Sequence, residues 1–341
     1  MLKKIERNIS YPSVLLLSNS KRKTFESLGK DIGKSGDTMA RLVTEHAVSI
    51  DGLVKLAQKI FLKKRIYLLI DDTLILKIYS QAIEGTSDNY SSSDRKSYRS
   101  LCSVVGMLTD GITAIPIDQK IWTSKEFNQN NYSKKWELAQ VLISEIKKFV
   151  NFKAVILDGL YAVKAFMNWL CDSKIFFEMR FHSNRVIEKK GKKYQIKKSP
   201  FIKLKKGRVR RTIKALWQNM HLHFTAFKRQ MANGEFSTVF QVSNFKALSS
   251  EHIKIYGYRW KIEKFFRTAK QKLGLNDCQS RKLERQKGHI FHVFIAYSIA
   301  QYERVRKKIK NVEDAIKSIK TQNSKNQNYA ISRFRQIFQS L

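Results

Sequence analysis

Residue types suited to phosphate chemistry are concentrated between positions 256 and 270. Tyr256, Arg259, Glu263 and Lys270 are spaced so that a helix, at about 100° per residue, places them within an arc of about 60°. An apolar stripe beside this arc predicts that the helix packs on a core. The other stripe then presents one carboxylate among a tyrosine and two cations. A plain surface helix with an Arg–Glu pair at i,i+4 is the alternative interpretation.

Further carboxylates stand at the ends of two apolar runs of strand length. Asp71 and Asp72 end the run that begins at Arg65, and Asp158 ends a later run. Open α/β sheets place their chemistry at the carboxyl ends of strands. One aspartate from each run, together with Glu263, supplies three carboxylates, the oxygen donors that Mg²⁺ prefers. Two such ions about 4 Å apart activate an attacking oxygen and stabilise the leaving oxygen of a phosphodiester.

The first acidic position of this set is ambiguous. Side chains alternate between the two faces of a strand, so Asp72 shares a face with the apolar residues at 66, 68 and 70. Asp71 then lies on the other face, as a neighbouring carboxylate or an exposed one.

The segments around these residues predict an α/β fold. Helical periodicity occurs at 134–150, 162–170, 258–273 and 283–310. Residues 80–98 are polar and serine-rich and predict a loop. Runs of strand character occur at 65–71, 74–79, 104–108, 114–122, 152–157 and 175–181.

A basic segment separates Asp158 from Glu263. Residues 185–214 hold 14 lysines and arginines and one acidic residue. Farther on, alternating residues flank Asn233-Gly234, the strongest short hairpin pattern. We therefore predict a basic, β-rich insertion at 185–250. The last segment, 311–341, is polar and predicts a partly disordered tail.

The N-terminal region, 1–58, predicts a small helical DNA-binding domain. Residues 21–47 have the spacing of a helix-turn-helix, in which Gly33 lets the chain turn sharply. The second helix, 37–46, is then the candidate for reading DNA. An ordinary helical hairpin packed on a larger domain is the alternative.

Charge is the strongest compositional feature of the 341 residues. Lysine and arginine number 66 and aspartate and glutamate 28, a net charge of +38. Such a protein attracts polyanions, nucleic acid first and an anionic membrane surface second. A hydrophobic content of 43% argues against general disorder, and we found no apolar run long enough to span a bilayer. Three isolated cysteines and an N-terminus without a signal-peptide pattern predict a cytoplasmic protein.

The spacing Y-x2-R-x3-E-x6-K, with Ile70-Asp-Asp-Thr73 and Leu157-Asp158-Gly, resembles that of bacterial insertion-sequence DDE transposases of the insertion-sequence-four group. The resemblance covers roughly residues 60–305. It implies an RNase H-like catalytic core (a mixed sheet flanked by helices) at 59–310, with a β-rich insertion before the glutamate.

This resemblance also implies roles for individual residues. Asp72, Asp158 and Glu263 correspond to the metal-binding carboxylates; Asp72 is favoured over Asp71 because the family's aspartate directly precedes Thr or Gly. The metal implied is a pair of Mg²⁺ ions, with Mn²⁺ able to replace them. Tyr256, Arg259 and Lys270 correspond to positions that contact DNA phosphates. For Trp260, we expect packing of the helix on the core.

The function implied is cut-and-paste transposition. A homodimer would cleave double-stranded DNA at the terminal inverted repeats and join the 3′-hydroxyl to target DNA. Two alternatives stay open: a non-transposing RNase H-like nuclease, and a catalytically silent DNA-binding protein derived from a transposase.

Overall fold

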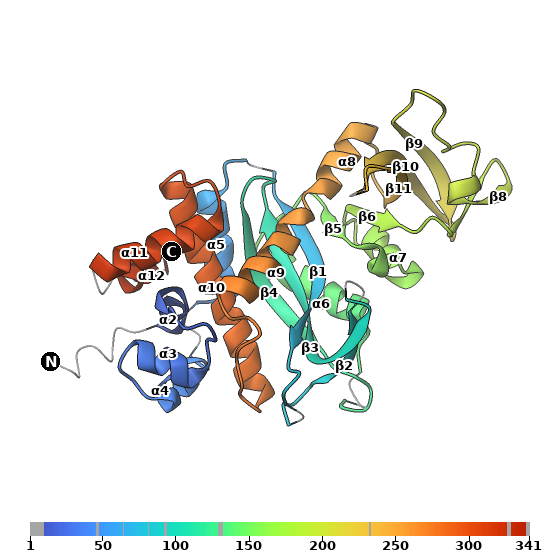
Figure 1. The fold of residues 1–341 in the computed structure, drawn as a ribbon. Coiled ribbons are helices and arrows are strands. Elements are labelled where there is room, and N and C mark those ends of the chain that lie inside the picture. The colour runs from blue at the N-terminus through green and yellow to red at the C-terminus, as the bar shows by residue number, and fades with distance from the viewer. Residues whose placement is uncertain are drawn as a thin grey trace.

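The structure, a computed structural model, describes residues 10–45, 48–63, 65–80, 82–91, 94–128, 132–231, 233–325 and 329–338. A mixed sheet lies in the middle, a bundle of helices at one end and a second group of strands at the other (Figure 1). This arrangement confirms the predicted α/β class. Within the described residues, no helix combines the length and hydrophobicity needed to cross a bilayer.

The core sheet has the strand order β4-β3-β1-β5-β6. Its members are β1 (Tyr67–Leu76), β3 (Lys96–Thr109), β4 (Ala114–Trp122), β5 (Val155–Leu157) and β6 (Phe177–Phe181). β1 pairs antiparallel with β3 and parallel with β5, and β5 pairs parallel with β6. β1 therefore lies in the centre of the sheet, with most of its side chains buried on both faces.

Two details of the sheet differ from the sequence prediction. The runs at 65–71 and 74–79 form one strand, β1, because β3 pairs with it continuously from Tyr67 to Leu76. The predicted loop at 80–98 contains β2 (Ser87–Ser91), which pairs with the first residues of β3. A polar sequence forms a strand here because the long β3 offers its edge as a partner.

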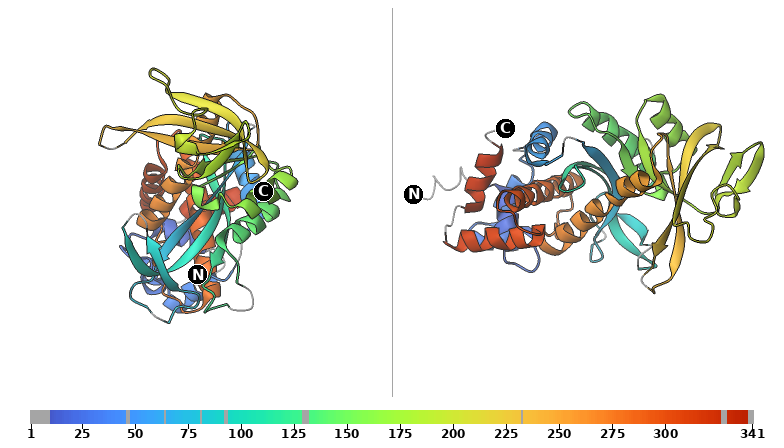
Figure 2. Two further views of the ribbon diagram at one scale, coloured as in Figure 1. Left: turned by 90° about the vertical axis from the view of Figure 1, so that its right-hand side faces the viewer. Right: turned by 90° about the horizontal axis from the view of Figure 1, so that it is seen from above.

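Helices cover the two faces of this sheet (Figures 1 and 2). On one face, α6 (Lys135–Lys147) packs closely: a Cβ on Gly106 would lie 2.6 Å from Cδ1 of Ile146. The short helix η1 (Gly159–Tyr161) and α7 (Lys164–Asp172) follow β5. On the other face lie α8 (Ser249–Gly257) and α9 (Trp260–Lys272). The predicted helix at 134–150 is thus confirmed, whereas the helix predicted at 258–273 begins after a break at Tyr258–Arg259.

The predicted insertion extends the core sheet. β11 (Phe236–Ser243) pairs antiparallel with β6, and the order continues β11-β10-β9-β7-β8. The remaining elements are β7 (Val186–Lys189), β8 (Lys192–Gln195), η2 (Ile196–Lys198), β9 (Arg210–Trp217) and β10 (Met220–Gln230). β10 and β11 form the hairpin predicted at Asn233-Gly234, where Gly234 has φ +83°.

The N-terminal residues form α2 (Tyr11–Leu17), α3 (Phe25–Asp31), α4 (Gly36–Leu42) and α5 (Ile50–Ile60). α3 and α4 make the predicted helix-turn-helix, with Gly33 at φ +67° in the turn. A Cβ on Gly29 would lie 2.6 Å from the carbonyl oxygen of Lys34, so only glycine permits this close crossing. The second helix ends at Leu42, earlier than predicted, and His46 lies outside the described residues.

The C-terminal segment, predicted as a polar tail, is helical. α10 (Leu283–Arg306) is followed by α11 (Val312–Lys325) and α12 (Tyr329–Phe338). The helices form because a few apolar residues are spaced to face the core and are buried, among them Ile316, Ile319 and Ile337.

The N-terminal helices and α10 share one core with the sheet. The hydroxyl of Tyr11 lies 2.9 Å from Nδ1 of His289 on α10. The backbone of α10 also passes so close to α4 that a Cβ on Gly288 would lie 2.2 Å from the carbonyl oxygen of Val43. The described N-terminal helices are thus fixed to the rest of the molecule.

This contact generates a stability prediction. Gly288→Ala should lower the free energy of unfolding by about 1–3 kcal/mol, because the added methyl group meets backbone that cannot rotate away. Gly257→Ala is the control, since a Cβ there meets nothing within 4 Å and alanine favours helices. Urea unfolding of both variants measures the effect; equal stability of the two would contradict the close packing of α10 on α4.

Candidate active site

The structure gathers acidic residues where the end of β5 lies beside the middle of β1. Ile70 pairs with Leu157 in the parallel register, so Asp71 and Asp158 follow it on neighbouring strands. The Asp71 side chain is only 14% exposed. Its carboxylate accepts the backbone N–H of Asp72 at 3.0 Å, which orients it along the strand.

Arg259 joins the middle of β1 to α9. Its guanidinium donates to Oδ2 of Asp71 at 2.8 Å and also pairs with the carboxylate of Glu263, one turn along the helix. Tyr256, before the break, donates from its hydroxyl to Oδ1 of Asp158 at 3.5 Å. The guanidinium lies 5.8 Å from the centre of the Tyr256 ring. These contacts link Asp71, Asp158, Tyr256, Arg259 and Glu263 into one group, called the carboxylate cluster below.

Asp72 lies outside this cluster. It shares the face of β1 that meets α6, where Lys135 Nζ donates to its Oδ2 at 2.7 Å. Cys102 and the hydroxyl of Tyr161 also lie 3.5 Å from its oxygens. The geometry therefore groups Asp71, and not Asp72, with Asp158 and Glu263, while the metal-binding role expected for Asp72 stays a prediction. Alternation along the strand was assigned correctly, but both faces of β1 are covered, so alternation alone did not reveal which face meets α9.

Lys270 also lies apart from the cluster. It is seven residues beyond Glu263, which corresponds to about 10 Å along α9. Burial lowers the pKa of its ammonium, an effect that the Asp94 carboxylate opposes. The structure thus brings together four of the six residues singled out by sequence and adds Asp71 to them.

Trp260 departs from its expected place in the core. Its side chain is 51% exposed, and the guanidinium of Arg229 on β10 lies 5.6 Å from its ring centre. The residue that follows Arg259 therefore faces the insertion and solvent, while Ile262 and Phe265 make the buried stripe of α9.

Burial sets the electrostatics of the cluster. It raises the pKa of Asp71 to about 7, because the charged carboxylate loses its hydration; Arg259 lowers this pKa, whereas Asp72 and Asp158 raise it further. On the other face of the strand, burial and the Asp72 carboxylate raise the pKa of the Cys102 thiol to about 12, so this cysteine stays protonated.

The family model of the transposase DDE domain matches residues 64–299, well over half of the chain. The chain belongs to this family. Its sheet is accordingly that of an RNase H-like core, and the match includes all six residues predicted from the sequence. No curated protein proved similar to the chain. Membership implies a transposase that acts on DNA as a polynucleotidyl transferase or nuclease.

DDE transposases generally use divalent metal ions, and the donors of the carboxylate cluster suit them. Asp71, Asp158 and Glu263 offer only oxygen atoms, the ligands of hard cations. A cation would also relieve the unfavourable burial of the Asp71 charge. In the described residues, however, no three His, Cys, Asp or Glu side chains stand close enough to hold a metal ion, and Arg259 occupies the space between Asp71 and Glu263. The three carboxylates therefore suit a metal ion chemically. In this structure Arg259 supplies the positive charge that balances two of them.

The two aspartates on β1 should respond differently to substitution. Because Asp71 titrates near pH 7 in the folded chain and at about 3.8 in the unfolded one, the folded state loses stability as pH rises between these values. Asp71→Asn removes this loss of stability. The melting temperature of the variant minus that of wild type should therefore increase from about pH 5 to about pH 8.

Asp72→Asn is the matched comparison, because it leaves Lys135 without its carboxylate partner. This variant should melt below wild type at neutral pH. A difference between Asp71→Asn and wild type that stays flat across the pH range would contradict the assignment of the buried carboxyl to Asp71.

Proposed function

We propose that the chain is a cut-and-paste DNA transposase in which Asp71, Asp158 and Glu263 hold two Mg²⁺ ions. One observation carries the proposal: in a chain of this family, Arg259 pairs with both Asp71 and Glu263, and Tyr256 links Asp158 to the same group. When bound, the metal pair activates the attacking oxygen and stabilises the leaving one, at end cleavage by water and at strand transfer by the 3′-hydroxyl alike.

The neighbouring residues position the DNA. Arg259 can exchange a carboxylate for a backbone phosphate, since a guanidinium binds both with the same forked geometry. Tyr256 holds Asp158 through its hydroxyl and keeps its proton: its pKa is raised, mainly by burial. Lys270, farther along α9, is suited to contact a phosphate away from the scissile one.

Other parts of the chain supply further DNA contacts in this proposal. The helix-turn-helix of α3 and α4 presents exposed polar residues to the element ends, and the basic insertion at 185–250 contacts the phosphate backbone. Two copies would bring the two inverted repeats together in the cytoplasm. The dense positive charge of residues 185–214 supports the role of the insertion, because backbone contacts depend on lysine and arginine.

The proposal predicts which carboxylates are needed. Asp71→Asn, Asp158→Asn and Glu263→Gln should each reduce Mg²⁺-dependent cleavage of duplexes carrying the element end by at least about 100-fold. Replacing a residue that only supports a metal ligand typically costs about 10- to 100-fold, so loss of a ligand itself should cost more. Asp72→Asn is the control and should retain most activity, because Asp72 lies on the opposite face of β1. Each variant is assayed by gel as purified protein with Mg²⁺.

The same preparation tests strand transfer into an unrelated plasmid. Joined products from wild type support a transposase, whereas cleavage without joining supports a nuclease. Wild-type cleavage by Glu263→Gln would contradict the carboxylate assignment, and activity lost in Asp72→Asn but kept in Asp71→Asn would restore Asp72 to the site.

A further inference from the structure

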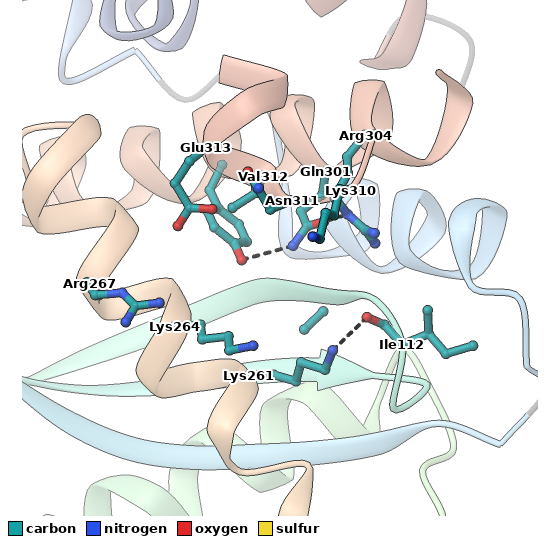
Figure 3. Close-up of a pocket in the computed structure, with 12 residues that line it drawn as sticks. Ile112, Lys261, Lys264, Arg267, Gln301, Arg304, Lys310, Asn311, Val312 and Glu313 are labelled. Atoms are coloured by element: carbon teal, nitrogen blue, oxygen red, sulfur yellow. Dashed lines mark hydrogen bonds between the residues drawn. The ribbon is translucent and has the colours of Figure 1, made fainter. Parts of the chain in front are cut away.

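A basic pocket of about 320 Å³ lies beside the carboxylate cluster. Its walls come from α9, α10, the start of α11 and the turn between β3 and β4 (Figure 3). Five cations line it: Lys261, Lys264, Arg267, Arg304 and Lys310. One carboxylate, Glu313, faces them. This concentration of like charge, in a cavity built by four separate elements, is the feature to be explained.

These cations lack acidic partners. Lys261 donates to the carbonyl oxygen of Ile112 at 2.9 Å, and Arg304 donates to Gln301 and Thr113. Glu313 is engaged by the hydroxyl of Thr268. Within the described part of the chain, none of the five forms an ion pair. Their mutual repulsion is visible at Lys261, whose pKa is lowered by burial and then by Lys264 and Arg304.

The arrangement of these groups on α9 separates them from the carboxylate cluster. Lys261, Lys264 and Arg267 recur every third residue, so they form one stripe whose middle lies about 100° around the helix from Glu263. In Figure 3 these side chains extend from α9 toward the space below α10 and α11. Glu263 pairs instead with Arg259, which reaches Asp71 on β1. One helix thus carries its glutamate and a basic stripe on different sides within the same two turns.

We propose that this pocket binds backbone phosphates of duplex DNA that extends from the cleavage site. Small-molecule sites are lined mainly by apolar side chains, whereas five of the six charged side chains that line this pocket are cations, which suits a polyanion. Phosphate oxygens accept well from lysine and arginine. DNA is the source of phosphate that the position favours, because α9 also carries Glu263. This inference rests on the proposed function and deepens it.

The test is a charge-matched pair of triple variants. Lys264, Arg267 and Lys310 are exposed, so their combined replacement by alanine should leave the fold intact. The control replaces Lys147, Lys148 and Lys153, exposed lysines at the end of α6 and just before β5, with the same loss of three charges. Circular dichroism and melting temperature verify folding of both.

The measurement is binding of a fluorescent duplex as a function of NaCl concentration. Each phosphate contact contributes about 0.9 to the slope of log K against log salt. The pocket variant should lose about 2 to 3 units of slope, and the control less than about 1. Equal slopes for the two variants would overturn the proposal, because only net charge would then matter.

A second arm separates DNA from free phosphate. Tripolyphosphate should raise the melting temperature of wild type more than that of the pocket variant, since the same cations bind it. A pocket variant that loses this shift but keeps the wild-type DNA slope would identify a site for free polyphosphate and overturn the DNA assignment. Cleavage by wild type and Glu263→Gln is measured in parallel. If the pocket variant keeps the wild-type salt slope, a loss of cleavage in Glu263→Gln still supports the carboxylate assignment. If Glu263→Gln cleaves normally, a reduced slope of the pocket variant still supports the phosphate site.

Discussion

The two contacts of Arg259 are the interaction on which this part of the molecule depends. Asp71, Asp158 and Glu263 place negative charge at one point of the sheet, where β1 and β5 meet, and Asp71 is nearly buried, where repulsion is weakly screened. Arg259 bonds Asp71 and Glu263 together, and so holds α9 against β1. A positive charge at this point is therefore needed by the fold. In the proposed function, a metal ion or a phosphate would enter a place where a side chain already balances the charge.

Because β1 is central, each of its two nearly buried aspartates needs a positively charged partner. Adjacent residues of a strand face opposite sides, so Asp71 and Asp72 bring a carboxylate to each covered face of the sheet. Each has its own cation from a different helix, Arg259 next to α9 and Lys135 on α6. Neither carboxylate could be buried alone, because an unpaired buried charge costs several kcal/mol. The pair of helices that covers β1 is thus selected by charge as much as by apolar contact.

Sequence reasoning succeeded where the signal is local. The periodicity at 134–150, the Asn233-Gly234 hairpin and the Arg259–Glu263 spacing all describe contacts between near neighbours, and all appear in the structure. It failed where the partner is distant. β2 forms only because β3 offers an edge, and the polar C-terminal segment is helical because a few isoleucines such as Ile316 meet the core. The choice between Asp71 and Asp72 stayed ambiguous for a similar reason, since it depends on which helix covers which face.

The distribution of charge on α9 shows how a strongly basic chain can keep a functional acidic site. If Lys261, Lys264 and Arg267 faced β1, they would pair with the carboxylates and compete with any metal ion. The helical repeat instead turns this stripe about 100° away, into a pocket where the cations meet no acidic partner within the described residues. Among the described residues of this region, Arg259, at the start of the helix, is the cation that pairs with the carboxylates. In the proposed function, the excess of +38 is compatible with catalysis because the fold separates the cations of the pocket from the carboxylate oxygens that would bind metal.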